Sequence, residues 1–207
     1  MSLLRTERGL DRLVTLLDGV VAIAITLLVL PLIDLFATGS QDHDLGAVLT
    51  DHAAQFGAFL LTFVIIARSW RTHHRLLERV GNYDEPFLLA NLAWVLTIVV
   101  LPFSTAVIAD FGTQRLSVAI YVGTIALNSA LMTAMRLLIV RRPVLQRPGD
   151  DGLGLSPLSS VVATGLTLLA LAVGVAFRAV NFYGLLLLLL TGPLVWLLQR
   201  TVARNAH

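Results

Sequence analysis

The 207-residue sequence contains no cysteine and no lysine, and it has few charged residues of either sign. Without cysteine, the chain has neither a disulfide framework nor a thiolate metal site. Charged residues make up only 14% of the sequence and the formal net charge is +2, so a nucleic-acid-binding role is not expected. Hydrophobic residues make up 57%, and the mean hydropathy is +0.82, far above that of soluble domains. The composition therefore indicates an integral membrane protein.

Six apolar stretches are long enough to cross a hydrocarbon core of about 30 Å, which takes roughly 20 helical residues. Among the fifteen arginines, only Arg115 and Arg178 fall on the side of the membrane opposite the two termini. By the positive-inside rule, the sequence predicts an all-α membrane protein of six transmembrane helices with both termini in the cytoplasm. Residues 1–207 are expected to form a single domain. The apolar stretches are 13–35, 53–72, 87–109, 116–139, 157–177 and 182–199.

Acidic residues gather in the predicted outer loops, opposite the arginines. An acidic mouth raises the local concentration of cations, whereas acidic loops are also ordinary solvated surface, and both interpretations stay open. The acidic residues are Asp34, Asp42, Asp44, Asp51 and Asp110.

The two longest connections are residues 36–52, which are polar, and residues 141–156, which are rich in proline, glycine and charge.

The first apolar stretch contains a carboxylate, Asp18, at membrane depth. An unpaired charge costs roughly 2.5 to 3.5 kcal/mol near the bilayer centre, so Asp18 is expected to have polar partners. At about 100° per residue, Leu27 and Leu30 fall close to Ile23 on a helical wheel, whereas Asp18 lies about 220° from Ile23. The carboxylate therefore faces neighbouring helices, away from the Ile23 stripe.

Polar side chains at a similar depth flank the connection between the second and third apolar stretches. Trp70 and His73 end the second stretch, and Asn91 lies about one helical turn inside the third. Arg12 precedes Asp18 by six residues, and its long side chain reaches the membrane interface. Together these five residues indicate a structural clamp, which holds the first helix against its neighbours, rather than a proton relay.

Neither a metal site nor a catalytic site is expected. His73 and His74 are adjacent, so on a helix their side chains diverge by about 100° and do not chelate one metal ion. The sequence has no HExxH motif and, at membrane depth, no phosphate-binding loop and no serine-histidine-aspartate set. We therefore expect no enzyme activity and no cofactor.

The run RLVTLLDGVVAIAITLLVL, followed by SWRTHH and NLAWVLTIVVLPFST, resembles the bacterial branch of the endolysosomal potassium channel family, the transmembrane protein 175 family. The hallmark of that family is Arg-x-x-x-Phe-Ser-Asp on the first helix, followed by an Ala-Ile-x-x-Thr-Leu-Leu run. Arg12 and Asp18 match the hallmark, but Leu16 and Leu17 replace its Phe and Ser. The missing hydroxyl implies that Asp18 depends more strongly on Trp70, His73 or Asn91.

This resemblance implies a homotetramer in which the first helices of four subunits line a central pore. It implies passive conduction of K⁺ with modest selectivity over Na⁺, in the plasma membrane of a bacterium. The expected partners are further copies of the chain, membrane lipid and the permeating K⁺ ions. Apolar rings favour such selectivity because a weakly hydrated cation such as K⁺ loses part of its water shell more easily than Na⁺.

The same resemblance assigns pore positions to the first helix. Ile23 falls at the main constriction, Leu27 and Leu30 supply further apolar rings, and Thr26 matches the threonine of the family's first helix. Asp34 is expected near the outer mouth, beyond a bend at the proline of residue 31, which cannot donate a backbone hydrogen bond.

Two alternatives from other classes stay open. A proton-coupled transporter would use Asp18 or His73 as a relay. A membrane scaffold without transport would bury the Ile23 stripe in ordinary helix packing, which is the interpretation that periodicity alone favours.

Overall fold

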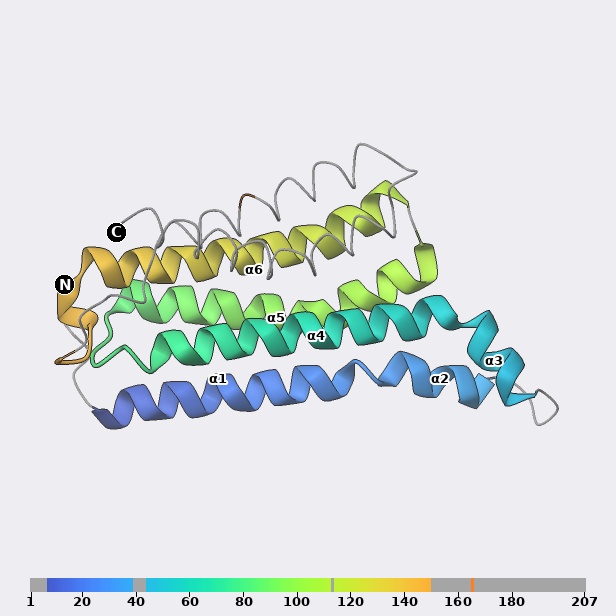
Figure 1. Cartoon of the computed structure of the whole chain (residues 1–207), viewed down its shortest axis with the longest axis horizontal. Helices are drawn as coiled ribbons and strands as arrows, with labels where there is room; N and C mark the ends of the chain where they lie inside the picture. The colour runs from blue at the N-terminus through green and yellow to red at the C-terminus, as the bar shows by residue number, and fades with distance from the viewer. Residues whose placement is uncertain (1–6, 39–43, 113, 150–164, 166–207) are drawn as a thin grey trace, which may run out of the picture.

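The computed structural model describes residues 7–38, 44–112, 114–149 and 165, and this part of the chain is helical (Figure 1). Apart from one isolated bridge between Val80 and Gln146, these ranges contain no β-structure. The elements are α1 (Glu7–Leu27), α2 (Leu30–Thr38), α3 (Leu45–Asp51), α4 (Ala53–Leu77), α5 (Glu85–Phe111), α6 (Arg115–Arg141) and the short 3-10 helix η1 (Pro143–Leu145).

Four helical segments are long and apolar enough to cross a membrane, and they agree with the first four predicted spans. The prediction of an all-α membrane protein is therefore confirmed for the described residues. The spans predicted at 157–177 and 182–199 lie outside the described residues, apart from residue 165. The four segments are Arg8–Leu35, Ala53–Leu77, Glu85–Phe111 and Arg115–Arg141.

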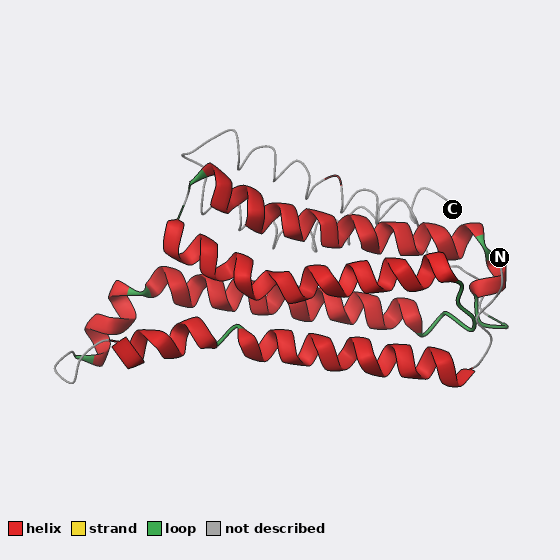
Figure 2. Ribbon diagram, turned by 180° about the vertical axis from the view of Figure 1, so that it is seen from behind, coloured by secondary structure: helices red, strands yellow, loops and turns green. Residues whose placement is uncertain are grey.

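Successive long helices run in opposite directions, as Figures 1 and 2 show. Helix α1 lies at one edge of the bundle and packs against α5 and α4, while α6 packs against α5 on the other side. This alternation brings the start of α1, the end of α4 and the end of α6 to the same end of the molecule. Most arginines of the described residues therefore lie at that end, which we call the arginine end.

A short interruption separates α1 from α2. Pro31 has no N–H to donate to the carbonyl of Leu27, and its ring crowds that carbonyl, so the helix cannot continue unbroken. Accordingly α1 ends at Leu27 and α2 begins at Leu30, with a two-residue turn between them (Figure 1). The bend expected at Pro31 is confirmed.

The predicted polar connection over residues 36–52 contains helix α3 and the end of α2. Leu45, Val48 and Leu49 recur at the i, i+3, i+4 spacing of a helix, and Asp44 precedes them in an extended conformation. The polar residues just before this short run hid its helical period from the sequence analysis.

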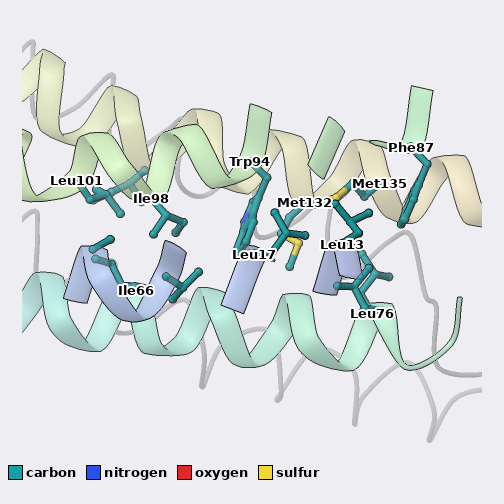
Figure 3. Close-up of a cluster of buried hydrophobic side chains, with 14 of the residues drawn as sticks. Leu13, Leu17, Ile66, Leu76, Phe87, Trp94, Ile98, Leu101, Met132 and Met135 are labelled. Carbon is teal, nitrogen blue, oxygen red and sulfur yellow. The ribbon is translucent and has the colours of Figure 1, made fainter. Parts of the chain in front are cut away.

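Buried apolar side chains of the four long helices meet in a common core (Figure 3). Because lipid tails are as apolar as leucine, this core stabilises the bundle chiefly by close van der Waals packing. Trp94 on α5 is the largest of the fully buried side chains. The core includes Leu13, Leu17, Ile66, Leu76, Phe87, Trp94, Ile98, Leu101, Met132 and Met135.

At the arginine end, the turn between α4 and α5 is joined to the segment around η1. The backbone N–H of Arg147 donates to the carbonyl of Arg79 at 2.8 Å, and that of Gly81 donates to the carbonyl of Leu145 at 2.9 Å. A Cβ atom at Gly81 would lie 3.0 Å from the Cα atom of Arg147, so a larger residue here would force the Arg147 backbone to move by a few tenths of an ångström. Part of the predicted connection 141–156 is thus packed against the bundle.

Asp84 performs two tasks at this end. Its Oδ1 atom accepts a hydrogen bond from the backbone N–H of Phe87 at 3.0 Å and so caps α5, while its Oδ2 atom forms an ion pair with Arg142. Asp84 is buried, so its charge is compensated by these two contacts. The start of α5 and the end of α6 are thereby fixed to each other.

We expect Asp84→Ala to lower the free energy of unfolding by about 2 kcal/mol, because it removes both the cap of α5 and the partner of Arg142. Thermal unfolding in detergent, followed by tryptophan fluorescence, measures the loss. Glu85→Ala is the matched control, since Glu85 is an exposed acid in the same helical turn. Equal unfolding midpoints for the two variants would contradict this role of Asp84.

Candidate functional site

Asp18 on α1 is joined directly to α4. The indole Nε1–H of Trp70 donates to Asp18 Oδ1 at 2.8 Å. The ring of Trp70 also lies against that of His74, with 5.4 Å between the ring centroids. A hydrogen bond to a carboxylate is stronger than one between neutral groups, and a low dielectric strengthens it further. This contact connects α1 to α4 at the level of the predicted clamp.

His73 and Asn91 form a second pair, deeper in the bundle. His73 Nε2 lies 2.8 Å from Asn91 Oδ1, and Asn91 Nδ2 donates to the carbonyl of Phe87 at 2.7 Å. The imidazole ring is stacked on the indole of Trp94, with 3.8 Å between centroids and 3° between planes. These side chains are buried and tie α4 to α5.

The structure does not bring Arg12 to the other clamp residues. Arg12 is exposed and, within the described residues, forms no hydrogen bond or ion pair. Six helical residues separate it from Asp18, a rise of about 9 Å. The predicted clamp is thus two hydrogen-bonded pairs, one between Asp18 and Trp70 and one between His73 and Asn91.

The two leucines that replace the family's Phe and Ser lie on different sides of α1. Leu17 is only 1% exposed and packs in the core, whereas Leu16 is exposed. At the family's serine position, this chain therefore has an apolar contact instead of a hydroxyl. That the hydrogen bond from Trp70 carries more of the polar attachment of α1 stays a prediction.

The predicted pore positions share one exposed face of α1 and its continuation α2. Ile23 is 61% exposed, and Leu27, Leu30, Thr26 and Asp34 are exposed as well. The Thr26 hydroxyl donates to the carbonyl of Ile23 at 2.7 Å, and its oxygen keeps acceptor capacity. The residues that α1 buries lie on its other side and are Leu10, Leu13, Leu17, Val21 and Ala24.

Sequence reasoning missed a set of polar side chains that join α4, α5 and α6. Ser69 Oγ donates to Asn128 Oδ1 at 2.7 Å, and Asn128 Nδ2 donates to Thr97 Oγ1 at the same distance. Asn128 therefore connects the other two helices through a single amide. The asparagine inside the fourth apolar stretch could have indicated this contact from the sequence, because such residues usually form hydrogen bonds between transmembrane helices.

A second polar contact between the same helices lies farther from the arginine end. The Thr62 hydroxyl is 2.9 Å from both the Thr105 hydroxyl and the Tyr121 hydroxyl. All three residues are buried. Helices α4, α5 and α6 thus share polar as well as apolar contacts.

Comparison with known proteins relates the part of the chain that holds these residues to a family. The family model described as "Endosomal/lysosomal potassium channel TMEM175" matches residues 12–102, which contain both clamp pairs and the exposed face of α1. Residues 12–102, which are less than half of the 207-residue chain, are therefore similar to the TMEM175 family. Within the described ranges, no three His, Cys, Asp or Glu residues are grouped so that they could hold a metal ion.

Bacterial and animal relatives match different shares of the chain. A potassium channel of Streptomyces collinus is 34% identical over 124 residues, which are 58% of this chain and 56% of that protein. A potassium channel of Chryseobacterium is 26% identical over 194 residues, which are 90% of this chain and 92% of that protein. The mouse endosomal/lysosomal proton channel TMEM175 is 29% identical over 129 residues, so the matched chain spans only 26% of its length.

A solved structure shares the fold of this chain. The crystal structure of a lysosomal potassium-selective channel TMEM175 homolog from Chamaesiphon minutus gives a TM-score of 0.70 at 22% identity. The similarity covers 91% of this chain and 98% of that one. The arrangement of helices is therefore that of this channel structure.

The hydrogen bond between Asp18 and Trp70 is testable by a double-mutant cycle. For Asp18→Ala and Trp70→Phe we expect a coupling free energy of about 1.5 kcal/mol, because the bond joins an indole N–H to a charged group. The unfolding free energies of the single and double variants, measured in detergent, give the coupling.

Asp11→Ala paired with Trp70→Phe is the matched control, since Asp11 is an exposed acid on the same helix. Its coupling should be close to zero, because no side-chain contact joins Asp11 to Trp70 within the described residues. A coupling for Asp18 that does not exceed this control value would rule out the bond as an anchor of α1.

Proposed function

We propose that this chain is a potassium-selective cation channel of a bacterial plasma membrane, formed by four copies around a central pore. The observation that carries the proposal is the exposed face of α1, which centres on Ile23 and lies opposite the anchor at Asp18. The bacterial relatives named above support it, since one of them is a potassium channel matched over 92% of its length.

Four copies of α1 would line the pore with apolar rings. Ile23 is the proposed constriction, and Leu27 and Leu30 form further rings toward the outer mouth. A ring of four isoleucines forces an ion to shed part of its water, which costs less for K⁺ than for Na⁺. Thr26 adds a hydroxyl oxygen beside the constriction, and Asp34 lies near the outer mouth.

The remaining topology belongs to the same proposal. The chain would cross the membrane six times as one domain, with both termini and the arginine end in the cytoplasm. The arginines at that end support this orientation through the positive-inside rule. The partners would be three further copies of the chain, membrane lipid and the permeating ions, with no cofactor.

The proposed role of the two clamp pairs is to fix the rotation of α1 about its own axis. The bond between Trp70 and Asp18 is on the side of α1 that faces α4, so it turns Ile23 away from the bundle. His73, Asn91 and Trp94 form a packed layer behind this contact and keep α4 and α5 in register.

Proton conduction is a second candidate for the same pore. The animal relatives are named proton channels, and Asp18 is a carboxylate within the first span. A single flux experiment separates the two candidates.

Proteoliposomes of the purified full chain should release K⁺ down its gradient faster than Na⁺ and without a pH gradient. Protein-free vesicles provide the baseline, and a pH-sensitive dye reports proton flux in the same preparation. Proton flux that exceeds K⁺ flux would favour the proton channel. K⁺ flux that requires a pH gradient would favour a transporter, and no flux from a folded oligomer would favour a scaffold.

We expect Ile23→Ala to increase K⁺ conduction and to lower the ratio of K⁺ to Na⁺ flux, because it widens the constriction and eases hydration. Each reduction of the barrier by about 1.4 kcal/mol raises the flux about tenfold. Leu96→Ala on α5 is the matched control, since Leu96 is also 61% exposed but belongs to another helix. Equal flux through the two variants would exclude Ile23 as the constriction.

A further inference from the structure

The exposed face of α1 begins with a positive charge. Arg12 precedes Ile23 by eleven residues, and at about 100° per residue this separation is three full turns plus about 20°. Arg12 therefore points to nearly the same side of the helix as Ile23. Leu16 and Gly19 lie between them on this side, and both are exposed.

The surroundings of Arg12 leave its charge uncompensated on that face. Within the described part of the chain, its guanidinium has no hydrogen bond and no ion pair. Asp18 is turned toward Trp70. Asp11 is exposed but lies about 100° around the helix from Arg12.

We infer that Arg12 forms a ring of four positive charges at the mouth of the pore that lies at the arginine end. This inference rests on the proposed function, because only copies arranged around an axis bring the four guanidinium groups together. Four unit charges about 10 Å from the axis lower the K⁺ concentration at that mouth about threefold in 0.1 M salt. Ions that enter from this mouth are depleted, so the channel rectifies in favour of entry from the other mouth.

Patches excised from spheroplasts that produce the full chain test this ring, because the membrane fixes the orientation of the channel. In 0.1 M KCl, Arg12→Gln should raise the current that enters from the arginine end about threefold relative to the unmodified chain. In 1 M KCl, where the Debye length falls to about 3 Å, the two currents should agree. Arg12→Lys keeps the charge and should behave as the unmodified chain does.

Arg75→Gln is the matched control, since Arg75 is an exposed arginine at the same end but on α4. It should leave the current unchanged, whereas an increase equal to that of Arg12→Gln would overturn the ring in favour of general surface charge. If Arg12→Gln does not assemble, the unmodified chain still tests the inference. The inference is overturned if the current of that chain does not rectify in 0.1 M KCl, or if the rectification persists unchanged in 1 M KCl. If the protein conducts K⁺ but Arg12→Gln has no effect, the ring alone is overturned. If the assembled protein conducts no K⁺, both the ring and the proposed function are overturned.

Discussion

The hydrogen bond from Trp70 to Asp18 joins α1 to α4, and its proposed role is to fix the rotation of α1 about its axis, which apolar packing alone leaves loosely determined. In a membrane, leucine packs nearly as well against lipid as against another helix, so apolar contacts discriminate weakly between rotations. A carboxylate at membrane depth has no such freedom, because it must meet a donor. In the proposed role, this single contact at 2.8 Å would decide which side chains of α1 remain uncovered.

The other long helices are joined in a different way. Asn128 connects α4, α5 and α6 through two hydrogen bonds, and Thr62 connects the same three helices through hydroxyl groups. Helix α1 instead lies at the edge of the bundle, on a core that it shares with α4 and α5. The bundle thus combines a polar-bonded unit of three helices with a helix that is attached mainly by packing.

Hydropathy and the helical period predict much of this arrangement. Apolar length located the first four spans, and the wheel separated Asp18 from the Ile23 face, because both depend only on the order of residues along one helix. The choice among Trp70, His73 and Asn91 as the partner of Asp18 was not predictable, since depth in the membrane says nothing about how neighbouring helices are rotated. The contacts of Thr62 were missed for the same reason, because a hydroxyl in an apolar stretch can satisfy itself on its own helix.

The amide of Asn91 has a consequence for the histidine beside it. Its Nδ2 atom is committed to the carbonyl of Phe87, so its oxygen must face His73 and can only accept. The neutral imidazole is therefore the tautomer with its proton on Nε2. A shift of that proton to the other ring nitrogen would require the amide to turn over and the Phe87 carbonyl to lose a donor. The tautomer of a side chain on α4 is thereby tied to the first turns of α5.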